Sequence, residues 1–399
     1  MEFFKPGITY DFMKLRTPLV GASIVVCIAA VVSVFVPGLN FGIDFAGGTE
    51  LQLHFQGDVS TAELRSTLEE MQYRSPDVVE VAGRDNTYLV RVREVTTLPA
   101  DIDQTIQGAL DAALEPSVES VRVSPGGDKV SVRLGAAADL TAIHDALTGA
   151  GVDVRGDVRR FGPESDFRYE ADLVGVADQI VGELRTRLGD RGPTDPERVE
   201  WVGPRAGEQL RNGAIKALLY AIGFIMVYVA FRFDLRFAPG GVVALIHDAL
   251  FTVLLYVVFQ KEFNLTTVAA ILTVIGYSIN DTIVVYDRIR ENLGRYRDKS
   301  LDEIINISTS QTLGRTIITS GTTMMSIIPF FYYGTQAVKD IVFAMMVGFF
   351  VGTYSSIYIA APITEWMDTR FFAPAREARK AELARQRKLK AAAKTPATT

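Results

Sequence analysis

Six apolar blocks, each close to the length that crosses a lipid bilayer, limit most strongly what this chain can fold into. A transmembrane helix needs about 20 apolar residues. The pattern therefore predicts a polytopic α-helical membrane protein with six transmembrane helices, and it excludes a purely soluble fold. We expect the spans at Pro18 to Val36, Ala214 to Phe231, Pro239 to Phe259, Leu265 to Tyr286, Thr316 to Tyr333 and Ile341 to Ile363.

The first block has the basic flank of a secretory signal, with Lys5, Lys14 and Arg16 before it. It is longer than the apolar core of a signal, and Val36-Pro37-Gly38 follows it in place of a small-residue cleavage site. We therefore expect an uncleaved span.

Lysine and arginine collect on alternate connections, which predicts the orientation of the spans. Basic residues mark the N-terminus, the turn at Arg232 and Arg236, the segment Arg288 to Lys299 and the tail Arg370 to Lys394. The positive-inside rule places all of these, and both termini, in the cytoplasm. We interpret the tail as a positive-inside anchor, with binding to anionic lipid or the ribosome as the alternative.

The long loop between the first two spans is acidic and is expected on the opposite side of a bacterial inner membrane, in the periplasm. Residues 41–211 carry 31 acidic and 18 basic side chains, against a formal charge of −6 for the whole chain. The expected order is a cytoplasmic N-terminus (1–17), transmembrane helix 1 (18–37), two periplasmic modules (38–125 and 126–211), transmembrane helices 2 to 6 (212–367) and a basic cytoplasmic tail (368–399).

The loop aligns with itself at an offset of about 80 residues, which indicates an internal repeat. In each half a Gly-Gly turn, at Gly47-Gly48 and Gly126-Gly127, precedes an alternating strand. Helices, further strands and second helices follow, so each half reads β-α-β-α-β. This order favours two ferredoxin-like α+β modules, and chance recurrence is the alternative. The later elements are expected at Thr61 to Met71, Tyr88 to Val92, Ile102 to Leu114 and Val118 to Val123, and at Thr141 to Ala150, Phe167 to Ala171, Val176 to Leu188 and Arg198 to Val202.

The residues that usually carry metal and thiol chemistry are scarce. Cys27 is the single cysteine and lies inside the first apolar block, so no intrachain disulfide is possible. With three histidines, the chain offers no Cys/His cluster for zinc. We expect no enzyme activity, no metal and no cofactor.

Ionisable residues near the middle of a span cost about 2.5 to 3.5 kcal/mol, so each needs a reason. His247 and Asp248 lie in the third block and Asp281 lies in the fourth. Arg315 directly precedes the fifth block. If these helices are neighbours, two carboxylates and one guanidinium can share a layer. Burial favours the protonated form of a carboxylate, whereas a nearby arginine favours the ionised form. Movement of the arginine would therefore switch proton uptake and release. These residues are therefore the predicted proton pathway.

Each of these residues also has a purely structural explanation. Asp281 can join helices by a hydrogen bond, Arg315 can reach the membrane surface from a helix end, and His247 with Asp248 can be a structural pair. Small residues indicate close helix packing, as in the Gly-x-x-x-Gly of Gly348 and Gly352. The fifth block is unusually polar, and its hydroxyls are candidates for lining a hydrated path beside Asp281.

Several motifs make the chain resemble the SecD/SecF family of protein-export membrane proteins, in its SecF branch. The most specific are Ile275-Gly-Tyr-Ser-Ile-Asn-Asp-Thr-Ile-Val-Val-Tyr-Asp-Arg-Ile-Arg-Glu-Asn292 and Gln311-Thr-Leu-Gly-Arg-Thr-Ile-Ile-Thr-Ser-Gly-Thr-Thr323. Further matches are Phe41-Gly-Ile-Asp-Phe-Ala-Gly-Gly-Thr-Glu50, Val202-Gly-Pro-Arg-Ala-Gly207 and Phe231-Arg-Phe-Asp-Leu-Arg236. The resemblance covers residues 1 to about 60 and 160 to 367. The loop departs from the family pattern, which has one ferredoxin-like module where this chain shows two.

The resemblance implies half of a bundle related to resistance-nodulation-division (RND) pumps, acting in the bacterial inner membrane. It assigns proton passage, driven by the proton motive force, to the residues that match Asp281 and Arg315. Asp248, His247 and Asn280 are supporting candidates, Gly276 joins the packing glycines, and Asp44, Gly47 and Gly48 form the motif after the first span. It implies no nucleic acid, and the partners are SecD, the SecYEG translocon, YajC- or YidC-type subunits, preprotein substrate and membrane lipids.

Other functions fit the same sequence features. The topology also fits half of an RND-like transporter for small molecules or lipids. Asp248 and Asp281 would form the dyad of an intramembrane aspartyl protease, although neither has a Gly-x-Gly-Asp setting. A passive assembly scaffold is the last alternative, and the coupling ion is either H⁺ or Na⁺.

Overall fold

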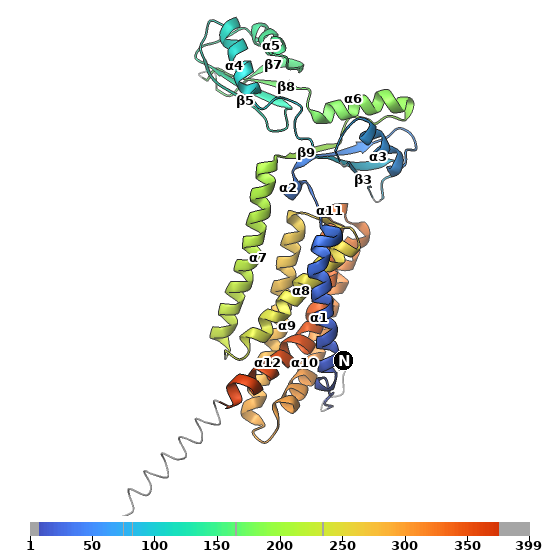
Figure 1. Cartoon of the computed structure of the whole chain (residues 1–399), viewed down its shortest axis with the longest axis vertical. Helices are drawn as coiled ribbons and strands as arrows, with labels where there is room; N and C mark the ends of the chain where they lie inside the picture. Colours follow the sequence, from blue (N-terminus) through green and yellow to red (C-terminus); the bar gives the residue numbers. More distant parts are fainter. Residues whose placement is uncertain (1–7, 75, 82, 164–165, 234, 375–399) are drawn as a thin grey trace, which may run out of the picture. The chain divides into compact units, whose positions relative to one another are not determined.

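The computed structural model describes residues 8–74, 76–81, 83–163, 166–233 and 235–374. The chain divides into two compact units, which are Met1–Asn40 with Ala214–Thr399 and Phe41–Gly213. Figure 1 shows long helices in the first and strands with short helices in the second. The basic residues Arg376 to Lys394 and Lys5 lie outside the described residues.

Six long helices and the short helix α12 form most of the described part of the first unit. They are α1 (Arg16–Ser33), α7 (Pro204–Arg232, which begins in the second unit), α8 (Ala238–Val258), α9 (Leu265–Arg295), α10 (Leu301–Tyr333), α11 (Gln336–Ser355) and α12 (Ala361–Met367). A 3-10 turn at Met13–Leu15 precedes α1, π turns occupy Val34–Gly38, Ser356–Ala360 and Asp368–Phe372, and the two-residue strands β1 and β10 are Asn40–Phe41 and Glu262–Phe263.

Five helical stretches of the described chain are long and apolar enough to cross a membrane, which confirms a polytopic helical membrane protein. They are Met13–Gly38, Pro204–Arg232, Ala238–Val258, Leu265–Arg295 and Ala337–Phe372. The remaining predicted span, Thr316 to Tyr333, is helical as the second half of α10. Its threonine and serine hydroxyls lower its hydropathy, so α10 is not among the five.

The long helices pack around α9. This helix contacts α8, α10 and α11, and α1 packs against α8 (Figure 1). The side of α9 that faces these neighbours is buried and includes Val274, Ser278 and Asp281. Two polar residues of α9 therefore lie inside the bundle.

Two ion pairs show which helix connections lie near the same end of α8. Beyond the C-terminus of α8, Lys261 pairs with Asp340 of α11 at 2.7 Å. Before the N-terminus of α8, Arg236 pairs with Asp368 at 3.1 Å. The turn between α7 and α8 therefore lies with the last helical segment, at the opposite end of α8 from the connection that follows it.

In the second unit, one antiparallel sheet has the strand order β3-β4-β2-β9. Its strands are β2 (Gly48–His54), β3 (Asp77–Glu80), β4 (Thr87–Val92) and β9 (Arg198–Val202). The helices α3 (Thr61–Glu70) and α6 (Val176–Leu188) cover one face of it. Leu51, Leu64, Val90 and Ile180 belong to their shared core.

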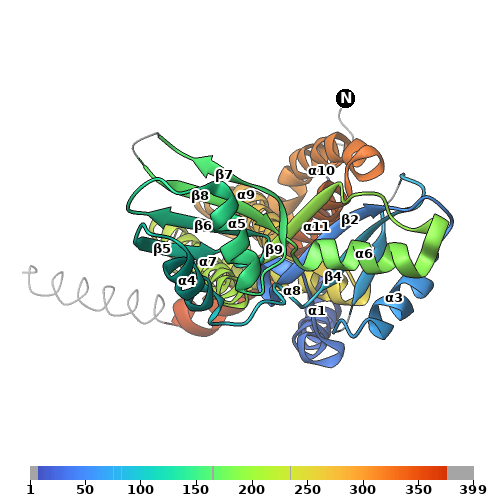
Figure 2. The same cartoon turned by 90° about the horizontal axis from the view of Figure 1, so that it is seen from above.

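A second antiparallel sheet has the order β5-β6-β8-β7. Its strands are β5 (Val118–Val123), β6 (Lys129–Leu134), β7 (Val154–Phe161) and β8 (Arg168–Leu173). The helices α4 (Ile102–Ala113) and α5 (Leu140–Gly149) pack on it, with Ile106, Leu110, Ile143 and Leu147 in the core. All of this lies between β4 and α6 in the sequence, so the second sheet is an insertion into the first (Figure 2).

The predicted boundary at residues 125 and 126 does not follow these sheets. The predicted elements exist within one or two residues of their expected ends, but α4 and β5 belong to the second sheet, while α6 and β9 belong to the first. The reason is strand pairing, because β9 forms its ladder with β2, with Leu51 opposite Val199. The 80-residue offset located similar elements without revealing which of them pair.

The inserted module touches the first sheet through a glycine. A Cβ atom at Gly126 would lie 2.7 Å from Nε1 of Trp201 on β9. Gly126→Val should therefore displace the indole and shift its fluorescence emission in a Trp366→Phe background, because a 2.7 Å contact requires one of the two groups to move. Gly108→Val on α4 is the control, since nothing lies within 4 Å of its Cβ position. An unchanged emission spectrum of the Gly126 variant would contradict this contact.

Candidate functional site

Asp248 on α8 is fully buried and tightly held. Its Oδ2 accepts hydrogen bonds from Ser278 Oγ of α9 at 2.5 Å and from Ser355 Oγ of α11 at 2.8 Å. Its Oδ1 lies 3.0 Å from Nδ1 of His247, which is also buried. One carboxylate thus connects three helices, and hydrogen bonds from two hydroxyls compensate for part of its loss of water.

Asp281 on α9 is buried as well, with 3% of its surface exposed, but its contacts are long. Its Oδ2 lies 3.4 Å from Ser320 Oγ of α10 and 3.5 Å from Thr353 Oγ1 of α11. Hydroxyl-to-oxygen bonds usually measure about 2.5 to 3.0 Å. The two hydroxyls instead bond each other at 2.8 Å. Asp281 is therefore a buried carboxylate without a tight partner among the described residues.

The two carboxylates occupy consecutive layers of one bundle. Ser278, which binds Asp248, precedes Asp281 by three residues on α9, about 4.5 Å along the helix axis. On α11, Thr353 and Ser355 contact the two carboxylates and are two residues apart. The π turn Ser356–Ala360 begins directly afterwards. Such turns within helices are frequent at functional sites.

The structure brings the two predicted carboxylates close but leaves the predicted arginine apart. Arg315 on α10 is exposed and lines a polar pocket of about 680 Å³ with Gln311, Thr312 and Arg288. In the described part of the chain, Arg315 forms no ion pair or hydrogen bond with Asp281. Ser320, which does contact Asp281, follows Arg315 by five residues on the same helix. Asn280 is exposed and points away from the buried side of α9.

The hydroxyl groups are the part of the site that the sequence reasoning mostly missed. Ser320 was among the polar residues of the fifth block, whereas Ser278, Thr353 and Ser355 were not singled out. The available signal was Thr353-Tyr-Ser-Ser356, a polar run inside an otherwise apolar block. No group of three or more His, Cys, Asp and Glu side chains able to hold a metal is found in the described ranges.

Removing the hydroxyls around Asp248 should destabilise the bundle. Each of Ser278→Ala and Ser355→Ala should cost about 1 to 3 kcal/mol, the range for a buried group that loses a hydrogen bond. The double variant should be worse than either single one, because Oδ2 then loses both donors. Thermal unfolding of the purified protein measures this, with Ser326→Ala on α10 as an exposed control. Unfolding midpoints of the Ser278 and Ser355 variants equal to that of the wild type would contradict a stabilising role of these hydroxyls.

Two glycines bring α11 close to this site. A Cβ at Gly348 would lie 2.1 Å from Cγ2 of Val274, and one at Gly352 would lie 3.0 Å from Cβ of Ser278. Both neighbours are on α9, so the Gly-x-x-x-Gly spacing places α11 where Thr353 and Ser355 reach the carboxylates. Gly276 faces open space, with nothing within 4 Å of its Cβ position.

The Gly47-Gly48 motif after the first span packs on the Val202-Gly-Pro-Arg-Ala-Gly207 motif. Asp44 is half-buried in the short helix α2 (Ile43–Ala46). Gly47 has φ +72°, and its Cβ would lie 3.1 Å from Cα of Pro204. Gly48 has φ +132°, and its Cβ would lie 2.3 Å from the carbonyl oxygen of Val92. Both the left-handed backbone and the close approach favour glycine, so this motif joins the start of α7 to the first sheet.

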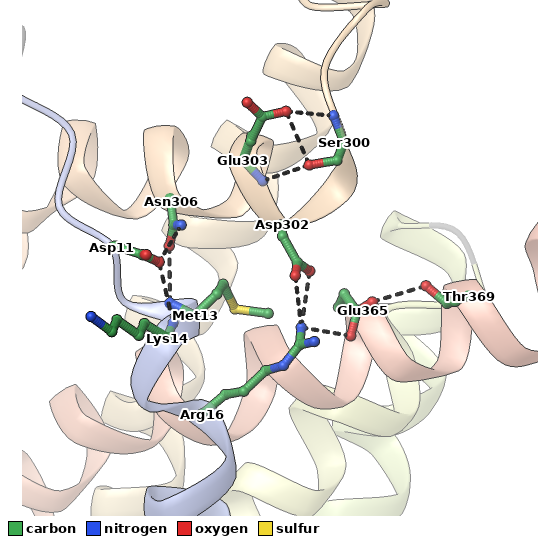
Figure 3. Close-up of polar contacts among 10 residues, drawn as sticks. All are labelled: Asp11, Met13, Lys14, Arg16, Ser300, Asp302, Glu303, Asn306, Glu365 and Thr369. Atoms are coloured by element: carbon green, nitrogen blue, oxygen red, sulfur yellow. Dashed lines mark hydrogen bonds and ion pairs between the residues drawn. The ribbon is translucent and has the colours of Figure 1, made fainter.

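An ion-pair cluster connects the start of α1 to α10 and α12 (Figure 3). Nη1 of Arg16 lies 3.0 Å from both carboxylate oxygens of Asp302 and 3.1 Å from Oε2 of Glu365. Asn306 adds a contact by accepting from the backbone N–H of Met13 at 3.0 Å. These contacts place the N-terminal segment, the start of α10 and α12 at the same end of the unit. Ser320 lies further along α10.

Two family descriptions match the chain. Residues 188–370 match the family described as protein export membrane protein SecD/SecF, C-terminal. Residues 32–59 match the SecD/SecF GG motif, which includes the glycine pair that packs on Pro204.

Curated proteins and solved structures point the same way. Protein translocase subunit SecF of Koribacter versatilis is 32% identical over 395 residues, covering 93% of this chain and 95% of that protein. Protein translocase subunit SecDF of Brucella abortus is 33% identical over 361 residues, covering 90% of this chain and 37% of that protein. The crystal structure of SecDF, a translocon-associated membrane protein from Thermus thermophilus, aligns with TM-score 0.62 and 28% identity over 92% of this chain. This chain spans 40% of the length of that structure.

Proposed function

Because the chain belongs to the SecF family of protein translocase subunits, we propose that it couples an ion gradient across the inner membrane to preprotein export. Within that role, as an accessory subunit of the Sec translocon, Asp281 carries the coupling ion. The observation that supports this most directly is the contrast between the two buried carboxylates. Asp248 is held by short bonds from two helices, whereas the hydrogen-bond partners of Asp281 in the described chain lie at 3.4 Å and 3.5 Å.

In the proposed mechanism, Asp248 is a fixed support and Asp281 changes its charge. A carboxylate held by short hydrogen bonds on several helices resists rearrangement, so the Asp248 layer keeps α8, α9 and α11 in register. Asp281 binds an ion together with the hydroxyls of Ser320 and Thr353, which lie on two other helices. Movement of α10 would bring Arg315 toward Asp281 and favour release of the ion, since an opposite charge favours the ionised carboxylate.

The proposed membrane topology has six spans, with α10 as the fifth. Three observations support it: its length of 33 residues, its packing against α9 and α11, and the ion pairs that group the helix ends. The connections rich in lysine and arginine then lie in the cytoplasm with both termini. We propose the periplasm as the location of the second unit.

Both sheets of the second unit are proposed to be ferredoxin-like. The first runs β2-α3-β3-β4-α6-β9 with order β3-β4-β2-β9, which is the β-α-β-β-α-β arrangement interrupted by one insertion. The second reaches the same arrangement by circular permutation, because β8, the last strand, occupies the place that β2 has in the first. Movement of these modules is the step that biases the exported chain outward.

The proposed partners are a SecD-type subunit and the SecYEG channel, with YajC- or YidC-type subunits beside them. The SecDF relatives, in which a chain like this one forms 37% or 40% of a longer polypeptide, support the SecD partnership. A carboxylate with neighbouring hydroxyls suits H⁺ or Na⁺, and no other cofactor is proposed.

Arg315→Ala should lower gradient-driven export by about tenfold or more, because a hydrogen bond to a charged group contributes about 1.5 to 3 kcal/mol and 1.4 kcal/mol is a factor of ten. Its unfolding midpoint should stay unchanged, since the side chain is exposed and forms no ion pair in the described structure. Arg315→Lys should retain part of the activity. Export of a secreted reporter from inverted vesicles measures both, and full export by Arg315→Ala would contradict the assigned role.

A further inference from the structure

The second sheet has one face that its helices leave uncovered, and this face carries a shallow groove. The helices α4 and α5 pack on the opposite face, around Ile106 and Ile143. The groove has a volume of about 320 Å³. Side chains from all four strands line it: Ser120, Arg122, Ser131, Arg133, Phe161 and Arg168.

The groove is basic within an acidic region. Arg133 pairs with Glu119 and Asp166 at 3.1 Å and 3.2 Å, and Arg168 pairs with Asp166 at 2.8 Å. Arg122 is exposed and has no ion pair within the described ranges. Residues 41–211 nevertheless carry an excess of 13 acidic side chains. Arg122 is therefore the guanidinium of this groove that is available to a carboxylate, because Arg133 and Arg168 are held by Glu119 and Asp166.

An aromatic ring marks the other side of the groove. Phe161 on the edge strand β7 is 60% exposed and lies opposite Arg168 in the strand register. Arg122 on β5 is three strand positions away from it and two residues along the strand, which at about 4.8 Å per strand and 3.4 Å per residue corresponds to roughly 16 Å. An extended chain covers this distance in about four to five residues.

We propose that this groove binds an extended, acidic segment of polypeptide, with a carboxylate on Arg122 and an apolar side chain on Phe161 about four to five residues away. The inference rests on the proposed function, because it assigns to the inserted module the recognition of chain that is being exported. The shallow opening fits side chains of an extended strand, and the guanidinium of Arg122, which has no ion pair in the described chain, favours a carboxylate over an amine.

Binding of labelled peptides to the full-length protein in lipid nanodiscs tests the groove. The probes are 12-residue Gly/Ser peptides with an Asp-Glu pair and a Leu four positions later, a version with Lys in place of the acids, and one with Leu adjacent to the acids. Fluorescence anisotropy should show at least tenfold weaker binding for the Lys peptide and weaker binding for the adjacent-Leu peptide. Affinity should also fall as salt is raised, because the charges are exposed.

Matched variants locate the site. Arg122→Glu should weaken binding of the acidic peptide at least tenfold, whereas Arg74→Glu, the same charge change on an exposed residue of the first module, should leave it unchanged. A photo-crosslinking residue at Ser131 should capture exported chain in cells, and one at Gln107, on the helix-covered side, should not. Circular dichroism and tryptophan emission establish that both glutamate variants are folded.

The outcomes separate this inference from the proposed ion coupling. Equal affinity for acidic and Lys peptides, or an Arg122→Glu variant that binds like the wild type, would overturn the groove assignment even if Asp281 proves essential. Asp281→Asn should keep peptide binding intact while it loses gradient-driven export. Selective peptide binding in a protein whose export ignores the ion gradient would support the groove and overturn the coupling.

Discussion

Asp281→Asn is expected to abolish the part of export that depends on the ion gradient, reducing it to the level of a strain that lacks the protein. Asparagine keeps the shape of the side chain and can still bond Ser320 and Thr353, but it cannot bind and release a proton or balance a cation. Export of a secreted reporter, measured with and without an imposed gradient, separates the two contributions. The part that does not respond to the gradient should be unaffected.

The control for this prediction is an exposed carboxylate in the connection between α9 and α10. Asp298→Asn removes the same charge without touching the buried layers, so gradient-driven export should remain at the wild-type level. Both variants must accumulate in the membrane and co-purify with the SecD-type subunit to the same extent. Normal gradient dependence in Asp281→Asn would reduce the chain to a scaffold.

A large effect on stability is also expected at Gly348. An alanine Cβ would lie 2.1 Å from Cγ2 of Val274, a side chain with no exposed surface, so Gly348→Ala must push α11 away from α9. Overpacking of this kind typically costs about 1 to 3 kcal/mol. The same displacement would move Thr353 and Ser355 from the carboxylates, so gradient-driven export should fall together with the unfolding midpoint.

Two variants test this explanation. Val274→Ala removes the methyl groups that the new Cβ would meet, so the double variant should be more stable than the sum of the two single effects predicts. Gly276→Ala on α9 makes the same chemical change where nothing lies within 4 Å, and it should not destabilise the protein. If Gly348→Ala and Gly276→Ala unfold alike, close contact between α9 and α11 is not what requires glycine.

Much of the membrane unit could be predicted from sequence because the physical demand on a span is local. An apolar stretch of sufficient length is visible without knowing its neighbours, and five predicted spans correspond to helices that meet this requirement. The fifth predicted block shows the limit. Its hydroxyls lower its hydropathy, yet Ser320 is one of two hydroxyl side chains that form a hydrogen bond with Asp281 in the described chain.

The arrangement of the soluble unit could not be predicted, because pairing between distant strands leaves no local signature. The strands β5 and β9 were both expected at their observed positions, yet each joins the sheet opposite to the one assumed. A pattern of alternating residues indicates that a strand has one buried face. It does not indicate which helices cover that face, and here an insertion separates α6 in the sequence from the sheet that it covers.

The site shows the same division between residue type and placement. Asp248 and Asp281 were identified because ionisable side chains are costly inside a span. Their contrasting environments depend on Ser278, Thr353 and Ser355, small hydroxyl residues that are ordinary in any helix. The position of Arg315 also depends on the rotation of α10, which the sequence pattern leaves open.

Ion flux through the reconstituted protein tests whether Asp281 carries the coupling ion. Liposomes that contain the chain with its SecD-type partner would receive a pH gradient or a sodium gradient, and trapped indicators would report the interior concentration of each ion. We expect that the wild type and Asp298→Asn dissipate one of the two gradients and that Asp281→Asn dissipates neither. Flux of the same ion at the wild-type rate through Asp281→Asn would contradict the assignment of Asp281 as the ion carrier.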